Sequence, residues 1–330
     1  IRVPVKSVAD GIQLSVTALG RTANDPVPTA PVYFIDKTIL FPHAVSKVTQ
    51  VSETGLAATL LPFPLTSTYA SINRVTGKLV IEAAGRTTLG SDIWEFDRSG
   101  VQSRKLLSDD AINSNPSWSP DGTKIVFQSK RGSEPTEVRV YDTATNKTTR
   151  LDQGLTPTWD ESGKAIIYSK GGGKTWNLWS KDLTKGTSPR QLTFGAQRDQ
   201  YPVAGKIGKA GVIVFASNRE TDVYDIWRID PSGKNPVRLT SVGKESGQRM
   251  VGPALSPNGD LIAFWEINYN ANQDHSVWLV NSDGTNPRRF IRKAANPQWA
   301  ANADGKQTLY FDSRVTGRAQ IWFVEGVSGP

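Results

Sequence analysis

A short motif recurs six times along the 330 residues, and this repeat constrains the fold more than any other feature. Each copy begins with an apolar residue and ends, four residues later, with an acidic or amide residue; five of the six copies have Trp in second place. The copies begin at Ile93, Val138, Leu178, Ile226, Val277 and Ile321. They are therefore 45, 40, 48, 51 and 44 residues apart. A period of this length is typical of propellers and solenoids.

Each copy follows an apolar run of strand length, and polar turns separate the runs. The runs lie at 78–81, 124–127, 165–168, 212–215, 261–264 and 308–311. Turns such as SPDG (119–122), DESG (160–163), SPNG (256–259) and NADG (302–305) supply the Asx chemistry and the glycine that a tight hairpin needs. Residues 115–151 alone contain four strand-like segments. The sequence therefore predicts an all-β, six-bladed β-propeller of four-stranded antiparallel blades.

The outermost strand of each blade has its own signature, a basic or polar residue followed by an apolar one. It occurs at Lys105, Arg150, Gln191, Arg238 and Arg289. The chain ends at Pro330, too soon to build a sixth copy, but residues 45–51 near the start fit the same pattern. We therefore expect this N-terminal strand to complete the last blade and close the ring, which removes the exposed sheet edges. Residues 1–42 are predicted to be an extended segment with a Pro-rich linker (24–31), and residues 43–330 to be the propeller.

These repeats resemble those of the TolB-like six-bladed β-propellers. The resemblance depends on NPSWSPDGTKIVF (115–127), on the Arg-bearing loop and Ile/Val-Trp strand that follow, and on outer strands ending in Leu-Thr (192–193 and 239–240). It covers roughly residues 43–325, whereas the first 42 residues show no α/β domain. It implies an extracytoplasmic binding protein. Related propellers also serve as gates of serine peptidases and as scaffolds of sugar-degrading enzymes, so the resemblance leaves the activity open.

Composition excludes several function classes. The chain has no Cys, which excludes a disulfide scaffold, a catalytic thiol and a cysteine zinc site. No apolar stretch is long enough to span a membrane, and the first residue, Ile1, suggests a processed chain. The net charge of +8 is spread along the chain without a run of basic and aromatic residues, so nucleic acid is not expected as a partner. We expect a monomer without a cofactor or a metal ion.

Three arginines are candidates for ligand binding at the mouth of the channel. Arg131, Arg219 and Arg314 each follow the aligned aromatic residue of a blade by three or four positions. Loops at this position share one propeller face with the connections into the innermost strands, where Asn115, Tyr201 and Asn296 lie. Arg binds carboxylates with two parallel hydrogen bonds, so an acidic ligand is predicted. The alternative is that each Arg pairs with a nearby acid, such as Glu134, Glu220 or Asp225, and fastens its own loop.

Two tryptophans and one histidine complete the candidate ligand site. Eight of the ten Trp residues recur at fixed blade positions and are expected to pack between blades. Trp176, in the loop 171–177, and Trp265 fall outside that pattern and could contact a ligand. His275 ends an oxygen-rich loop (268–275), which could bind a polar ligand or, weakly, calcium; with a single Asp among its residues, a solvated loop is the favoured interpretation.

Two function classes remain open. The first is a non-enzymatic, extracytoplasmic propeller whose channel mouth docks a protein segment or an acidic glycan. The second is a glycan-active enzyme, a lyase or hydrolase, that uses mouth carboxylates with Arg, Tyr201 or His275. Its candidate acids are Glu82, Glu266 and Asp312, although strand alternation could point some of them away from the channel.

Overall fold

The computed structural model describes residues 5–8, 11–14, 50–52, 56–61, 66–84, 91–97, 100, 103–107, 109–268, 275–301 and 305–329. The chain divides into two compact units, Ile1–Val45 and Ser46–Pro330. Within the first unit, β1 (Val5–Val8) and β2 (Gly11–Leu14) pair as an antiparallel hairpin. The boundary predicted between residues 42 and 43 lies outside the described residues and stays a prediction.

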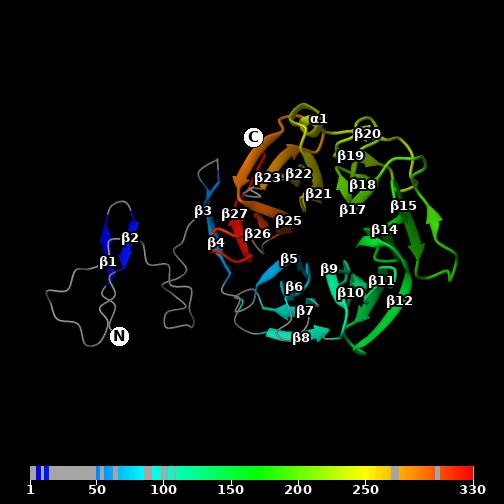
Figure 1. The fold of residues 1–330 in the computed structure, drawn as a ribbon, viewed down its shortest axis with the longest axis horizontal. Helices are drawn as coiled ribbons and strands as arrows, with labels where there is room; N and C mark the ends of the chain where they lie inside the picture. The colour runs from blue at the N-terminus through cyan, green and yellow to red at the C-terminus, as the bar shows by residue number, and fades with distance from the viewer. Residues whose placement is uncertain are drawn as a thin grey trace. The chain divides into compact units, whose positions relative to one another are not determined.

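The second unit is a six-bladed all-β propeller, with six antiparallel sheets arranged radially in chain order (Figure 1). The first two blades are β5 (Ser67–Ile72), β6 (Leu79–Ala84), β7 (Ser91–Phe96), β8 (Ser103–Leu107), then β9 (Ile112–Trp118), β10 (Lys124–Lys130), β11 (Glu137–Asp142), β12 (Lys147–Gln153). The third and fourth are β13 (Leu155–Trp159), β14 (Ala165–Gly172), β15 (Thr175–Asp182), β16 (Arg190–Gln191), then β17 (Asp199–Ile207), β18 (Ala210–Ser217), β19 (Asp225–Ile229), β20 (Val237–Arg238). The short helix α1 (Val242–Ser246) precedes the fifth, β21 (Arg249–Leu255), β22 (Leu261–Ile267), β23 (Ser276–Asn281), β24 (Arg288–Arg292). These confirm the predicted four-stranded blades.

The sixth blade has five strands, three from the C-terminal end of the unit and two from its N-terminal end. Its first three are β25 (Ala294–Ala301), β26 (Gln307–Ser313) and β27 (Gln320–Glu325). The outer strand beside β27 is β4 (Ala57–Leu60), with Leu60 opposite Trp322, and β3 (Gln50–Val51) pairs with β4. The strand beside β27 is therefore β4 and not the predicted segment 45–51, of which residues 50 and 51 lie at the edge of the same sheet as β3. Residues 45–49 lie outside the described part of the chain.

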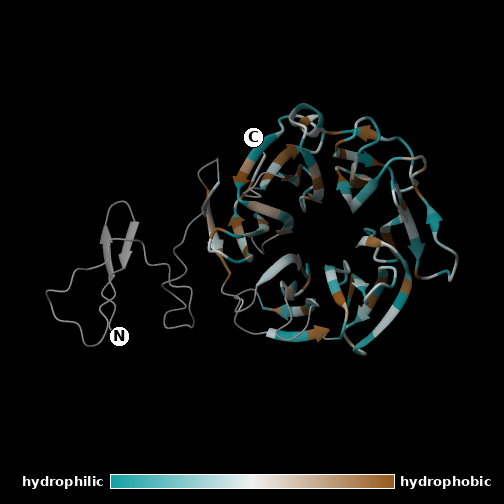
Figure 2. Cartoon of the chain, in the orientation of Figure 1, coloured by the Kyte–Doolittle hydropathy of each residue, from teal (hydrophilic) through white to brown (hydrophobic). Residues whose placement is uncertain are grey.

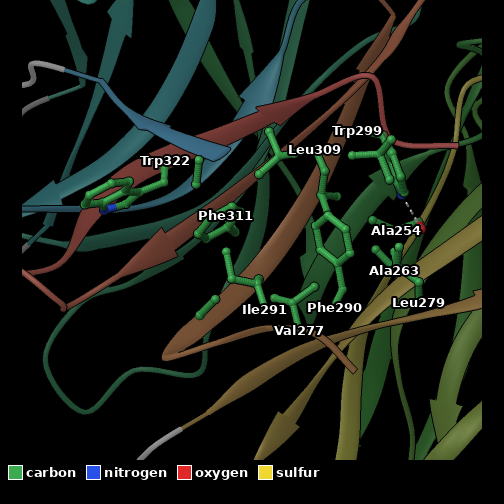
Figure 3. Close-up of a cluster of buried hydrophobic side chains, with 14 of the residues drawn as sticks. Ala254, Ala263, Val277, Leu279, Phe290, Ile291, Trp299, Leu309, Phe311 and Trp322 are labelled. Atoms are coloured by element: carbon green, nitrogen blue, oxygen red, sulfur yellow. Dashed lines mark hydrogen bonds between the residues drawn. The ribbon is translucent and has the colours of Figure 1, made fainter. Parts of the chain in front are cut away.

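The repeated aromatic residues hold the blades together. Hydrophobic residues are found in the strands of all the blades, alternating with hydrophilic ones (Figure 2). Between the fifth and sixth blades, Trp299 donates its indole N–H to the Ala254 carbonyl oxygen at 3.1 Å, next to Phe290 and Phe311 (Figure 3). Trp159 makes the same bond to Ser117 at 3.0 Å. Because a buried indole needs a polar partner, these bonds fix the sixth and third blades against the preceding ones.

Third-strand tryptophans are covered by cations of their own blade. Lys105 lies 5.2 Å from the centre of the Trp94 ring, Lys170 lies 5.3 Å from Trp179, and Arg289 lies 5.1 Å from Trp278. Trp322 is fully buried. These positions agree with the packing role predicted for the repeated Trp residues.

Candidate functional site

One face of the propeller gathers the loops on which the candidate site depends. In the second blade, Ile112 at the start of the innermost strand pairs with Lys130, and Ser129 pairs with Glu137. The start of the first strand and the loop between the second and third strands therefore lie at the same end of the blade. We call this end of all six blades the mouth face.

Each innermost strand carries one residue in the left-handed region, at the same point of the blade. The φ angles are 55° at Tyr69, 53° at Asn115, 49° at Thr156, 57° at Tyr201, 56° at Gly252 and 51° at Asn296. At this point the pairing with the second strand shifts register, as in a β-bulge. Holding a non-glycine residue there costs about 1–3 kcal/mol, and such strain is concentrated at functional sites. We call these six residues the channel ring.

The channel ring includes three residues predicted from the sequence and three that sequence reasoning missed. Asn115, Tyr201 and Asn296 were predicted to lie at the mouth, and their ligand contact stays a prediction. Tyr69, Thr156 and Gly252 were missed. A signal for two of them is visible: in five blades the ring residue precedes a proline, at 116, 157, 202, 253 and 297. Proline has no N–H to donate to the strand ladder, so its recurrence in a strand indicates a bulge.

Second-strand side chains hold the ring by its backbone. Three of them accept a hydrogen bond from the backbone N–H of the ring residue in the following blade. The pairs are Glu82 with Asn115, Gln128 with Thr156 (2.8 Å), and Asp312 with Tyr69. All three acceptors stand one place after an aligned apolar residue of the second strand. Two of the acids proposed for catalysis therefore join neighbouring blades.

Glu82 and Asp312 titrate close to neutral pH. Burial raises the pKa of Asp312 from 3.8 to about 7, although its oxygen accepts a 2.7 Å hydrogen bond from the Asn296 side chain. Burial also raises the pKa of Glu82 from 4.5 to about 7, and the charge of Asp312 adds to the rise. Burial also raises the pKa of Tyr69, which hydrogen-bonds to Asn115, and the charges of Glu82 and Asp312 add to the rise. At neutral pH each carboxyl can therefore give or take a proton.

Glu266 does not belong to this cluster. Its carboxylate accepts a hydrogen bond from the Trp278 indole N–H at 3.0 Å and lies 3.9 Å from the Arg289 guanidinium. Trp278 lies in β23 and Arg289 in β24, the third and fourth strands of the fifth blade. Neighbouring residues of a strand point to opposite faces, and the side chain of Glu266 is on the face that meets these two residues. The prediction that Glu266 is a channel-mouth acid is therefore wrong.

Two of the three candidate arginines fasten their own loops. Arg131, on the second blade, forms a 2.8 Å ion pair with Asp109, which precedes the innermost strand. Arg219, on the fourth blade, is bound to Asp199 at 3.1 Å, and Asp199 is fully buried. The Arg219 guanidinium also lies 4.9 Å from the centre of the Trp227 ring. Neither partner is among the acids named from the sequence, but the loop-fastening alternative describes both arginines.

Arg219 also faces away from the channel. It lines a pocket of about 190 Å³ between the third and fourth blades, together with Leu192, Phe194 and Ile229. Because its charge is neutralised by Asp199, we remove Arg219 from the candidate channel site. Arg314, on the sixth blade, is exposed, and within the described residues no hydrogen bond or ion pair joins its guanidinium to a carboxylate.

Trp265 and His275 are brought together. The two rings meet edge to face with their centres 5.0 Å apart, and His275 Nδ1 accepts a hydrogen bond from the Asn268 backbone N–H at 3.2 Å. Trp265 also lies against Gly252: a Cβ atom there would stand 2.6 Å from its indole nitrogen. Gly252 is therefore required for this arrangement. The rest of the predicted polar loop, 269–274, lies outside the described residues.

Trp176 is not in a loop. It lies in β15, opposite Gly171, and its backbone N–H donates to the Gln197 carbonyl oxygen at 3.0 Å. The loop predicted at 171–177 is a tight hairpin, because β14 continues to Gly172 and β15 begins at Thr175. The structure thus places Trp176 beside the connection into the fourth blade and not in the channel ring.

The space enclosed by the ring is narrow. Tyr69, Thr156, Tyr201 and Gly252 line a cavity of about 40 Å³, together with prolines of the innermost strands. That volume holds a few water molecules but no sugar ring. A ligand larger than a few water molecules therefore needs space outside this cavity.

Comparison with known proteins identifies the family. The sequence profile of the TolB beta propeller domain matches residues 75–248, more than half of the chain. The chain belongs to the TolB β-propeller family. An uncharacterized protein of Agrobacterium fabrum is 28% identical over 209 residues, which cover 58% of this chain and 68% of the relative. The Tol-Pal system protein TolB of Francisella tularensis is 26% identical over 216 residues, 52% of this chain and 49% of its own length. This chain thus spans about half the length of that TolB relative.

Solved structures show the same fold. A putative TolB from Agrobacterium tumefaciens superposes with a TM-score of 0.61 at 18% identity, over 83% of this chain and 98% of the other. An oligogalacturonate lyase from Vibrio parahaemolyticus superposes with a TM-score of 0.54 at 11% identity, over 84% and 96%. At these identities the likeness concerns the fold alone.

Proposed function

We propose that this TolB-family propeller is a non-enzymatic binding protein whose mouth face docks an extended segment of another protein. The observation that supports it most is the channel ring. Six bulged strands, five of them with a strained non-glycine residue, lie below a circle of loops, and the cavity inside is too narrow for a sugar substrate. Concave mouths with a few polar groups are the usual sites of binding.

A protein segment explains the surface better than a glycan. Sugar rings are commonly held on exposed aromatic faces. Among the described residues, the exposed large apolar side chains are Val75, Ile112, Phe194, Val237 and Val315. The aromatic one, Phe194, lines the pocket between the third and fourth blades and not the channel.

An extracytoplasmic location and a monomeric state are part of the proposal. Membership of the TolB family supports the location. In the described part of the chain, no helix is long and apolar enough to cross a membrane. Cell fractionation and light scattering of the purified protein test the two statements.

Selective blocking of one face tests the docking function. The chain has no Cys, so one engineered thiol can be coupled to a polyethylene glycol maleimide without side reactions. Ser133→Cys lies in an exposed mouth loop, and Lys209→Cys lies in an exposed turn at the opposite end of the fourth blade. Peptides selected from a random displayed library on the wild-type protein should lose binding to the first conjugate and keep it to the second. Equal binding to both conjugates, or no selected peptide, contradicts the proposal.

A second candidate, a glycan-active enzyme, is favoured by one observation. Glu82 and Asp312 have pKa values of about 7 and lie in neighbouring blades, as an acid and base pair requires. Oligogalacturonate incubated with the protein and followed at the absorbance of unsaturated products decides between the candidates. Turnover that is lost in Glu82→Gln and Asp312→Asn supports the enzyme, and no turnover supports the binding protein.

A further inference from the structure

Three exposed cations lie together on the mouth face of the sixth blade. Lys293 ends the connection into β25, and the Ser313 hydroxyl donates to its carbonyl oxygen at 2.6 Å, which places that connection beside the loop after β26. In this loop Gly317 donates its backbone N–H to the Arg314 carbonyl oxygen at 2.9 Å, so the chain turns tightly. Arg314 and Arg318 stand at the two ends of the turn. We call Lys293, Arg314 and Arg318 the blade-six cations.

The blade-six cations differ from the arginines of the second and fourth blades in their surroundings. Those blades provide a carboxylate, Asp109 or Asp199, in the connection or at the start of the innermost strand, and it neutralises the loop arginine. The corresponding connection of the sixth blade provides Lys293. Within the described ranges, no ion pair or hydrogen bond joins the charged groups of the blade-six cations to a carboxylate.

Asp312 is the carboxyl next to Arg314, whose charge lowers the pKa of Asp312 against the larger rise from burial, but no ion pair joins the two side chains. It is 8% exposed, and it accepts hydrogen bonds from the Asn296 side chain and the Tyr69 backbone N–H. Its carboxyl is therefore bound to two residues of the channel ring, whereas Arg314 is exposed. Positive charge on this side of the mouth is left for an outside anion, and mobile salt ions screen such charges only beyond about 10 Å at ~0.1 M.

We propose that the blade-six cations bind an acidic stretch of the docked protein segment. This rests on the proposed docking function and adds the chemical class of the segment and the side of the mouth that it contacts. Guanidinium groups suit the carboxylates of Asp and Glu side chains, and Val315, 36% exposed between the two arginines, offers an apolar contact of the size of a side chain. The two arginines flank that contact on one turn, which suits a polypeptide with acidic residues on either side of an apolar one.

Charge reversal with a matched control tests the inference. The test variant is Lys293→Glu, Arg314→Glu, Arg318→Glu. The control is Lys164→Glu, Lys209→Glu, Lys234→Glu, three exposed lysines in turns of the opposite face. Both lower the formal net charge from +8 to +2, because three cations become anions. The probe is a fluorescein-labelled peptide of about ten glutamates, measured by anisotropy at about 50 and 200 mM NaCl on samples with unchanged melting curves.

The test variant should bind the glutamate peptide at least about tenfold more weakly at low salt and lose most of its salt dependence, whereas the control should stay within about twofold of wild type. Equal weakening of both variants means that bulk charge attracts the peptide and overturns the inference, as does unchanged binding of the test variant. An oligogalacturonate with the same number of carboxylates that binds more tightly through the same residues would overturn the choice of a protein segment. The library peptides separate the two proposals. If coupling at Ser133→Cys blocks peptides that are not acidic, and these peptides bind the test variant as well as the wild type, the docking function stands and this inference fails.

Discussion

The loops of the fourth and sixth blades carry an arginine at the same position, yet the two side chains have opposite surroundings. Arg219 is 17% exposed, bound to the buried Asp199 and stacked near Trp227. Arg314 is exposed in the loop that lies beside Lys293, and its neighbour Asp312 is hydrogen-bonded to Asn296 of the channel ring. A recurring residue in a repeat protein therefore has no fixed role, because its partner comes from a connection that varies from blade to blade.

This difference separates stability from binding. Breaking a buried ion pair lowers stability, because removal of one partner leaves the other as an uncompensated charge that water cannot reach. An exposed cation contributes little to stability and remains available to an outside anion. The following substitutions test whether the two blades differ in this way.

The largest effect on stability is expected from Arg219→Ala. It leaves Asp199 charged and fully buried, which should lower the free energy of unfolding by about 3–5 kcal/mol. Urea unfolding measures it, and the double variant Arg219→Ala, Asp199→Ala should recover part of the loss. If Arg219→Ala does not fold, Arg219→Lys should fold with a smaller loss, because it retains the charge. A change below about 0.5 kcal/mol would show that the ion pair is not structural.

The second-largest effect is a change of stability with pH, and it is expected from Asp312, the carboxyl next to Arg314, together with Glu82. The folded-state pKa of Asp312 and of Glu82 is about 7, above their ordinary values of 3.8 and 4.5, because burial favours the neutral form. The resulting stability is fully present below about pH 4 and is lost as the pH rises through 7. Asp312→Asn with Glu82→Gln should therefore remove a loss on the order of 1–3 kcal/mol per carboxyl between pH 5 and 8.

The pH series also sharpens the comparison of the two arginines. Stability that rises with pH, and a steeper fall at acidic pH in the wild type than in the double variant, would mean that Asp312 is a paired carboxylate. Arg314 would then resemble Arg219, and the two blades would not differ.

The smallest effect on stability is expected from Arg131→Ala. Its ion pair with Asp109 is largely exposed, and such pairs contribute about 0–1 kcal/mol. The urea midpoint should move little, and added salt should remove the difference. A loss comparable to that of Arg219→Ala would show that exposure does not separate the two pairs.

Much of the fold could be predicted from the sequence because the repeat supplies many independent copies of one pattern. The second and third strands follow from periodic apolar residues and Trp, and the turn glycine Gly122 has the expected positive φ, 71°. The closing strand was assigned wrongly because its signature is only two residues long. Lys47-Val48 and Thr59-Leu60 both have a polar residue before an apolar one, and contact with Trp322 decides between them.

The candidate site was less predictable, since it depends on contacts between blades. Strand alternation allowed Glu266 to face either way, and its bond to Trp278 shows the outward direction. Asp199 lies 20 residues before Arg219 in the chain, so no local pattern indicated that pair. Of the blade-six cations, only Arg314 was predicted from the sequence. Lys293 and Arg318 were missed because neither recurs in the other blades.

The most direct measurement compares Arg219→Ala with Arg314→Ala in the same two assays, urea unfolding and anisotropy of the labelled glutamate peptide. Our account predicts opposite results. Arg219→Ala loses about 3–5 kcal/mol of stability and binds the peptide within about twofold of wild type, whereas Arg314→Ala keeps its stability within about 0.5 kcal/mol and binds at least about fivefold more weakly. Weaker binding in Arg219→Ala at conditions where it is folded, with unchanged binding in Arg314→Ala, would contradict the account.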